Sequence, residues 1–126
     1  MYLRDDVQAK SLTSLAWKIQ VFLAVDFLAS AALQKKAVLN YVNDSAPMHF
    51  ASAMNAPVAA IYCSTVPDFG YGPLSDTSFI IETKQALNCR PCGLHGKKQC
   101  PLKHFNCAET ITMEQIYQPL QQVLHN

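Results

Sequence analysis

The sequence has almost no net charge, and this absence argues against one large class of functions. Ten lysine and arginine residues stand against nine aspartate and glutamate residues, so the formal net charge at pH 7 is +1. Proteins that bind nucleic acid usually carry a clear basic excess, and this balance implies no basic face. We therefore expect no nucleic acid among the partners.

The N-terminus lacks the features of a secretory signal, and the chain lacks a long uninterrupted apolar run. Asp5 and Asp6 stand where a signal peptide would have its basic region. The most apolar stretch, residues 15–33, is interrupted by Lys18 and Asp26. A membrane span needs about 20 mostly apolar residues, and a central charge costs about 2.5–3.5 kcal/mol on insertion scales. We expect a cytoplasmic protein without a membrane span.

The chain contains no internal repeat and no low-complexity segment, and its length of 126 residues suggests one domain at most. Hydrophobic residues make up 50% of the chain and charged residues 15%. This is enough apolar material for a compact core, so global disorder is not expected.

Short apolar runs predict the strands, and apolar residues at helical spacing predict the helices. The predicted strands are residues 38–42, 58–63 and 79–83. The predicted helices are residues 11–37, a short helix that has Pro47 in its first turn and runs to residue 55, and residues 110–125. Near-continuous apolar strands are typical of a parallel sheet covered on both faces. The fold class is therefore α/β, with a small parallel sheet, an N-terminal helix and a C-terminal helix. Three strands are few for a complete doubly wound domain, which suggests that part of the domain is missing.

Individual side chains of the predicted helices can also be placed. We expect Trp17, Phe22 and Phe27 of the first helix in the core. Thr112 is the expected N-cap of the last helix because it precedes the apolar pattern. The expected buried side of that helix consists of Ile116, Leu120, Val123 and Leu124.

The joint between the first predicted strand and the helix after it is the most informative segment. In open α/β sheets ligands bind at the carboxyl ends of strands, and free N–H groups at a helix N-terminus favour phosphate. Ser45 offers a hydroxyl to such an anion, and His49 follows within the first helical turns. Asp44 repels phosphate, so it would accept hydrogen bonds from sugar hydroxyls or hold the turn. The alternative is that Asp44 or Ser45 is only an N-cap and His49 an ordinary helical residue.

The chain has five cysteines, and four of them lie close together near the C-terminus. The four have the spacing C-x2-C-x7-C-x6-C and are Cys89, Cys92, Cys100 and Cys107. Four thiolates can close a tetrahedral site, so a structural zinc ion is one prediction. Free thiols or an oxidised pair are the alternatives, since the second half lacks the close spacing of the first. Cys63 lies in an apolar run and is expected to be a small core residue.

Several of these features resemble glycosyltransferase family 9, whose members include the heptosyltransferases. Residues 44–51, Asp-Ser-Ala-Pro-Met-His-Phe-Ala, resemble the family signature Asp-Ser/Thr-Gly-x-x-His-x-Ala. Residues 57–63, followed by Ser-Thr-Val-Pro at 64–67, resemble the next strand and its loop, and the Cys-x-Pro-Cys at 89–92 resembles the tail of many members. The resemblance covers residues 31–124. We expect an unmatched helical segment over residues 1–30, followed by residues 31–126 with a cysteine-rich loop at 88–108.

The resemblance implies a partial Rossmann-like domain, the C-terminal, donor-binding half of a GT-B enzyme. Asp44 would contact the donor sugar, while the backbone at Ser45 and Ala46, with His49, would hold the diphosphate. Ala46 replaces the usual glycine, which puts the close approach of the phosphate in doubt. The implied donor is a nucleotide-diphosphate sugar similar to ADP-heptose, and no cofactor is required.

The family's acceptor is of the lipopolysaccharide type, and its binding surface and catalytic base belong to an N-terminal domain that we expect to be missing. The resemblance also implies a location in the cytoplasm or at the inner face of the inner membrane. The alternatives are a small zinc-binding interaction module and an inactive truncated product.

Overall fold

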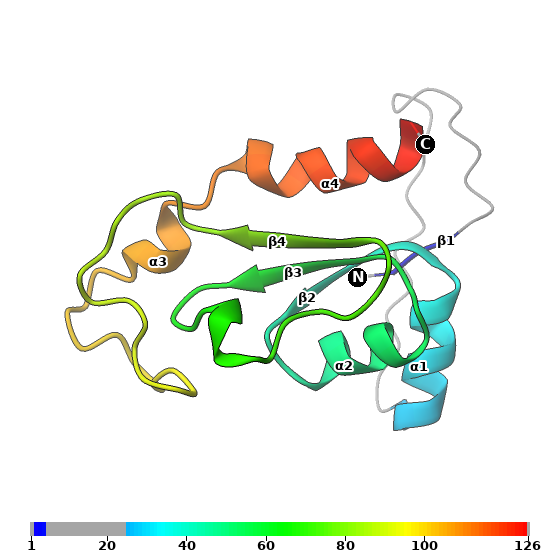
Figure 1. The fold of residues 1–126 in the computed structure, drawn as a ribbon, viewed down its shortest axis with the longest axis horizontal. Coiled ribbons are helices and arrows are strands. Elements are labelled where there is room, and N and C mark those ends of the chain that lie inside the picture. Colours follow the sequence, from blue (N-terminus) through cyan, green and yellow to red (C-terminus); the bar gives the residue numbers. More distant parts are fainter. Residues whose placement is uncertain (1, 5–24, 126) are drawn as a thin grey trace.

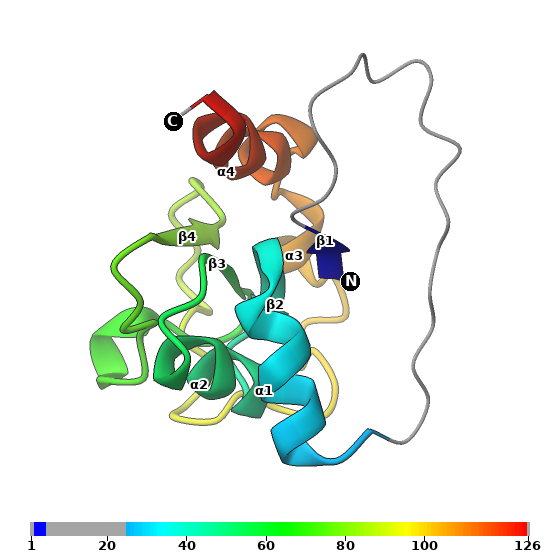
Figure 2. The same ribbon diagram turned by 90° about the vertical axis from the view of Figure 1, so that its right-hand side faces the viewer.

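The computed structural model describes residues 2–4 and 25–125. The strands are β1 (Tyr2–Arg4), β2 (Ala37–Asn43), β3 (Val58–Tyr62) and β4 (Ser78–Glu82). The helices are α1 (Phe27–Lys35), α2 (Ala46–Ala53), α3 (Asn106–Glu109) and α4 (Met113–His125), with a 3-10 helix at Pro67–Phe69. α1 and α2 lie on one face of the sheet and α4 lies on the other, as Figures 1 and 2 show.

The sheet has the strand order β1-β2-β3-β4. β2, β3 and β4 run parallel, with Asn40 opposite Val58 and Val58 opposite Ser78. These are the three predicted strands, so the predicted α/β class with a small parallel sheet is confirmed. β1 pairs antiparallel with β2 and was not predicted. A strand of three residues is too short to produce a recognisable alternation.

Each face of the sheet has its own apolar cluster because successive residues of a strand point to opposite faces. On β3, Val58, Ala60 and Tyr62 pack with Met48 on the side of α2. Ala59 packs on the opposite side, in the cluster beneath α4. A central strand buried on both sides explains why this segment is apolar throughout.

α1 begins and ends with clear local signals. The carboxylate of Asp26 accepts a hydrogen bond from the N–H of Ala29 at 2.7 Å, which makes Asp26 the N-cap. The helix ends at Lys35 because Ala37 already belongs to β2. The predicted helix over residues 11–37 is therefore two residues too long at its end, and its part over residues 11–24 lies outside the described residues.

The prediction that Phe27 belongs to the core is wrong. Its side chain is 73% exposed, and its ring lies beside that of Phe50, with 5.4 Å between the centroids. The other two aromatic residues of that prediction, Trp17 and Phe22, lie outside the described residues.

α4 begins with a capping box at the predicted residue. The hydroxyl of Thr112 accepts from the N–H of Gln115 at 3.3 Å, and the Gln115 side-chain oxygen accepts from the N–H of Thr112 at 3.0 Å. The Gln115 amide also donates to the carbonyl of Glu82 at 2.7 Å, which ties the helix to the end of β4. The helix continues through Pro119, so this proline does not split it.

The predicted buried side of α4 is correct in three of its four positions. Ile116, Leu120 and Val123 pack against the cluster on this face of the sheet, whereas Leu124 is 44% exposed. Leu124 follows Val123 by about 100° of helical rotation, which places it beside the buried stripe. None of the helices in residues 25–125 is both long enough and apolar enough to cross a bilayer.

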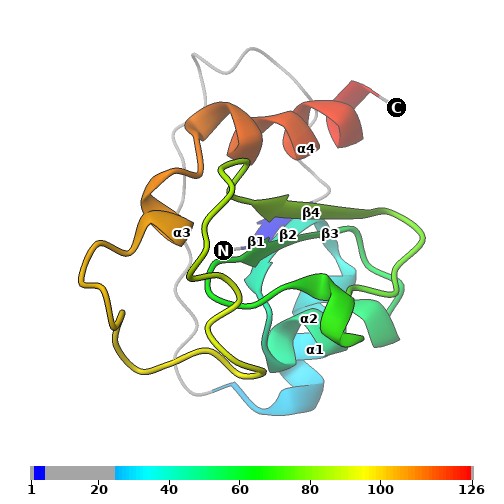
Figure 3. The same ribbon diagram turned by 60° about the vertical axis from the view of Figure 1, so that its left-hand side comes forward.

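The three parallel strands end at one edge of the sheet, and a long irregular segment covers part of that edge. This segment, residues 83–105, contains neither helix nor strand. Figures 1 and 3 show it leaving β4 and passing around the carboxyl ends of the strands before it reaches α3. α3 begins within the loop predicted over residues 88–108, so the irregular part ends at residue 105.

Candidate functional site

The joint between β2 and α2 is an exposed helix N-terminus at the carboxyl edge of the sheet. Ser45 has extended backbone angles, with φ −151° and ψ 179°, and its carbonyl accepts from the N–H of Met48 at 2.9 Å. It is therefore the N-cap, but its hydroxyl makes no capping hydrogen bond. Ser45, Ala46 and Pro47 are exposed to solvent. The first turn of the helix is thus open to an anion, which its backbone dipoles favour.

α2 begins at Ala46, in agreement with the predicted N-cap at Asp44 or Ser45 and with Pro47 in the first helical turn. The non-glycine residues with positive φ in residues 25–125 are Asn55, Lys103 and Phe105. Ala46 is the first residue of α2 and has ordinary helical geometry. The turn therefore does not require glycine at this position for conformational reasons. What the Ala46 side chain can still change is the space available to a phosphate.

Asp44 is fixed by a residue from the neighbouring strand end. Its carboxylate accepts a hydrogen bond from the hydroxyl of Thr65, a buried residue shortly after β3. This contact joins the turn after β2 to the loop after β3. Asp44 is thus not the N-cap of α2, and its bonded role is to hold the two loops together. One carboxylate oxygen makes that bond, and the other makes no hydrogen bond within residues 25–125.

His49 lies on the exposed side of the first turns of α2. It follows Ser45 by four residues, so both belong to the same side of the helix. It makes no hydrogen bond to another residue of the described part of the chain. Its placement allows a role beside an anion at the helix N-terminus and equally allows that of an ordinary surface histidine.

A buried polar network that the sequence did not reveal holds the start of α2. Gln34 of α1 is fully buried and donates to the carbonyl of Pro47 at 3.0 Å. The amide of Asn40 in β2 donates to the carbonyls of Gln34 and Pro57, each at 3.0 Å. These bonds connect α1, β2 and α2 on the covered face. The amide oxygens of Gln34 and Asn40 are buried without a partner, so the network positions the start of α2 through its donors alone.

Arg90 is the second feature that the sequence did not reveal. Its Nε donates to the carbonyl of Cys63 and its Nη2 to the carbonyl of Thr65, both at 2.8 Å. Nη2 also forms an ion pair with Glu82 at 2.5 Å. In the structure Arg90 attaches the irregular segment to the loop that holds Asp44.

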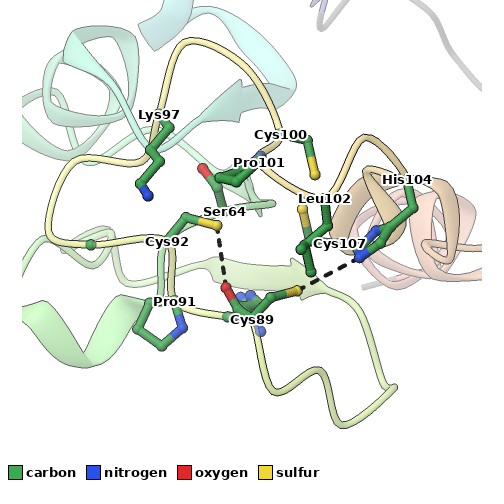
Figure 4. Close-up of a pocket in the computed structure, with 12 residues that line it drawn as sticks. Ser64, Cys89, Pro91, Cys92, Lys97, Cys100, Pro101, Leu102, His104 and Cys107 are labelled. Carbon is green, nitrogen blue, oxygen red and sulfur yellow. Dashed lines mark hydrogen bonds between the residues drawn. The ribbon is translucent and has the colours of Figure 1, made fainter.

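The four clustered cysteines line one cavity of about 410 Å³, which we call the cysteine cavity. Its other lining residues include Ser64, Arg90, Lys97 and His104. Figure 4 shows the four thiols around this common space. All five cysteines are free thiols. Within residues 2–4 and 25–125, no three histidine, cysteine, aspartate or glutamate side chains are already placed to hold one metal ion. The four predicted ligands thus line one cavity, but their side chains do not lie at the spacing that binds a metal ion.

The thiols experience different surroundings. Burial, followed by the proximity of Cys92, raises the pKa of Cys107. Backbone N–H groups, that of Phe105 above all, lower the pKa of Cys100. Burial also raises the pKa of Cys63, which lies half-buried at the end of β3 and outside the cavity lining. The backbone around Cys100 thus favours its thiolate form, whereas burial and the nearby thiols disfavour a negative charge on Cys107.

Comparison with known proteins gives one result. The family model for glycosyltransferase family 9 (heptosyltransferase) matches residues 5–105. The match reaches into the segment 1–30, for which the sequence offered no resemblance, and stops before α3 and α4. Neither a curated protein nor a solved structure matches the chain. Because the family model covers most of the sequence, including the turn at Asp44 and three of the clustered cysteines, the chain belongs to glycosyltransferase family 9.

Proposed function

We propose that the joint between β2 and α2 binds the diphosphate and the sugar of a nucleotide-diphosphate sugar donor. The observation that carries this proposal is the exposed N-terminus of α2, where the Ser45 hydroxyl is not used for capping. Eight helical residues follow it, and their aligned dipoles favour negative charge at this end. Family membership makes a sugar nucleotide the expected anion.

In this proposal, different residues at the joint bind different parts of the donor. The N–H of Ala46 and the hydroxyl of Ser45 donate to the diphosphate, and His49 supports the same charge from the next turn. Asp44 repels phosphate, so its unbonded oxygen accepts a hydrogen bond from a sugar hydroxyl. Thr65 holds that carboxylate in place. These donors act on the leaving group, where negative charge grows during transfer.

The finer proposal is transfer of a heptose-like sugar from an ADP donor to a lipopolysaccharide-type acceptor on the cytoplasmic side of the membrane. An acceptor hydroxyl would attack the anomeric carbon, the bond to the diphosphate would break, and a base would remove the hydroxyl proton. The acceptor surface and the base would come from a second domain, as in GT-B enzymes. The joint described here would supply donor binding and leaving-group stabilisation only.

Donor binding can be tested by thermal unfolding of the chain with increasing ADP. At a ligand concentration 100 times Kd, a single site stabilises the folded state by about 2.7 kcal/mol. For a domain of this size, the melting temperature should rise by about 10 °C. Adenosine, which lacks the diphosphate, should produce a much smaller rise. The Asp44→Ala and His49→Ala variants should lose most of the ADP effect.

Two matched variants control for general effects of removing a charge or an imidazole. Glu114→Ala and His125→Ala change exposed residues of α4, on the opposite face of the sheet from α2, and should respond to ADP like the unmodified chain. Circular dichroism establishes that each variant is folded. If saturating ADP leaves the melting temperature of the folded chain unchanged, the proposed donor site is wrong. If adenosine raises the melting temperature as much as ADP does, the diphosphate does not contribute to binding and that part of the proposal is wrong.

A further inference from the structure

The cysteine cavity brings together thiols from two turns of the irregular segment and from helix α3. Cys89 and Cys92 come from the turn that follows β4, and Cys100 comes from a second turn of the irregular segment. Cys107 is buried on α3. The donor site proposed above uses none of these side chains. A group of four thiols around one space therefore requires its own explanation.

The first pair lies on a tight turn of the kind that presents two thiols to one ion. The Cys92 thiol donates to the carbonyl of Cys89 at 3.2 Å, and Gly93 follows with φ +80°. A residue with a side chain is disfavoured at that angle, so the glycine allows the chain to turn directly after the second cysteine. The spacing C-x2-C is the usual half of a structural zinc site.

The second half contains another tight turn. The N–H of Lys103 donates to the carbonyl of Cys100 at 3.1 Å, and Lys103 itself has φ +59°. This turn places Cys100 on the cavity that Cys89 and Cys92 also line. The second turn therefore brings a third thiol to the same space.

The charges around the cavity match a cation with thiolate ligands. The four cysteines line one cavity, and four thiolates around one space repel one another unless a cation lies between them. Zinc with four thiolates carries a net charge of −2 and releases the thiol protons on binding. Lys97 lines the cavity and offsets part of this remaining charge, whereas Arg90 lines it but is already paired with Glu82.

His104 faces the cluster as a hydrogen-bond donor. Its Nδ1 accepts from the N–H of Asn106 at 3.0 Å, so the neutral ring carries its proton on Nε2. That atom lies 4.0 Å from the sulfur of Cys89. In this tautomer, Nε2 donates toward a thiolate and has no lone pair to offer a metal. The geometry favours four sulfur ligands over three sulfurs and one nitrogen.

We propose that the cysteine cavity is a structural zinc site in which one ion is bound by the four thiolates of Cys89, Cys92, Cys100 and Cys107. The side chains are not yet at ligand spacing, so binding draws the irregular segment closer around the ion. That segment has no helix or strand to disrupt. Four protein ligands leave no open position, so the zinc has no role in chemistry. It links the turn that carries Arg90 to α3.

The test measures zinc in the full chain, produced in zinc-supplemented medium and purified with a thiol reductant but without chelator. We expect stoichiometric zinc by elemental analysis and a fall in melting temperature when a strong chelator is added. Cys92→Ser and Cys107→Ser should lose most of the zinc. Cys63→Ser is the matched control, because Cys63 does not line the cavity, and it should retain all of it.

Cobalt(II) substitution keeps the test decisive if the serine variants fail to fold. Cobalt bound by four thiolates in tetrahedral geometry gives intense visible bands and sulfur-to-metal charge transfer in the near ultraviolet. A weak, octahedral spectrum would overturn the proposal. A folded, metal-free chain whose melting temperature does not change with chelator would also overturn it. The same holds if mass spectrometry shows the four thiols paired as disulfides. None of these measurements involves ADP, so this proposal and the donor site can fail separately.

Discussion

Replacing Arg90 by alanine should destabilise the protein more than any ordinary surface change, because this guanidinium joins three parts of the structure. It bonds two carbonyls after β3, those of Cys63 and Thr65, and pairs with Glu82 at the end of β4. Its side chain is only 12% exposed. Truncation would leave the two carbonyls without their donors in a region with little access to water.

The size of the effect follows from the number and exposure of these bonds. A hydrogen bond that involves a charged group contributes about 1.5–3 kcal/mol, so the two bonds to carbonyls contribute about 3 kcal/mol at the lower end. The Glu82 side chain is 38% exposed, so the ion pair adds about 1 kcal/mol at most. We expect Arg90→Ala to lower the free energy of unfolding by about 3–4 kcal/mol.

Urea unfolding followed by far-ultraviolet circular dichroism measures this change. Arg90→Lys keeps the charge but has no planar fork to reach both carbonyls, so it should still lose about 2 kcal/mol. Lys98→Ala, an exposed cation of the same segment, is the control and should change stability by less than about 0.5 kcal/mol. If Arg90→Ala is as mild as Lys98→Ala, the proposed anchoring of the segment by Arg90 is wrong.

Two further predictions concern a glycine of the same segment and the buried tyrosines. Gly96 has φ +70°, and a Cβ there would lie 2.5 Å from the hydroxyl oxygen of Ser64, so Gly96→Ala should cost about 1–2 kcal/mol in urea unfolding. Gly72→Ala meets no atom within 4 Å and should be nearly neutral; equal effects would contradict the close contact. Burial, as the largest cause, raises the pKa of Tyr41 and of Tyr62 above the ordinary value of 10.0. This stabilisation is complete below pH 10 and is lost as the pH rises through the raised values, so the melting temperature should fall above about pH 10. Tyr62→Phe should reduce the steepness of that fall, and an unchanged slope would refute the assignment.

The sequence was a good guide wherever the cause of a structure is local. Three parallel strands and the capping box at Thr112 follow from apolar runs and from side chains close in sequence. The N-cap at Ser45 and the early Pro47 likewise depend only on their neighbours. Predictions from local sequence alone made the first helix two residues too long and wrongly placed Leu124 on the buried side of the last helix. Both errors concern element ends, where the tertiary environment decides.

The contacts that shape the candidate site were not predictable in the same way. Asp44 and Thr65 are 21 residues apart, and Arg90 contacts carbonyls 25 and 27 residues away. Gln34 looked like one more polar residue at the end of a helix, yet it is fully buried against Pro47. Residue type alone does not reveal such pairs, because the partners meet only once the sheet has brought the strand ends together.

These long-range contacts make the turn between β2 and α2 and the irregular segment 83–105 parts of one structure at the carboxyl edge of the sheet. The N–H of Cys92 donates to the carbonyl of Ser64 at 2.7 Å, and Arg90 holds the carbonyl of the next residue, Thr65. Thr65 in turn fixes the carboxylate of Asp44. The position of the Asp44 side chain, which we propose to contact the sugar, therefore depends on the irregular segment 83–105. None of these bonds joins that segment directly to α2. A segment that lacks helix and strand can serve as such a support only if something else restrains it. Arg90 restrains its beginning, and the cavity formed by its thiols is where a metal ion would restrain its end.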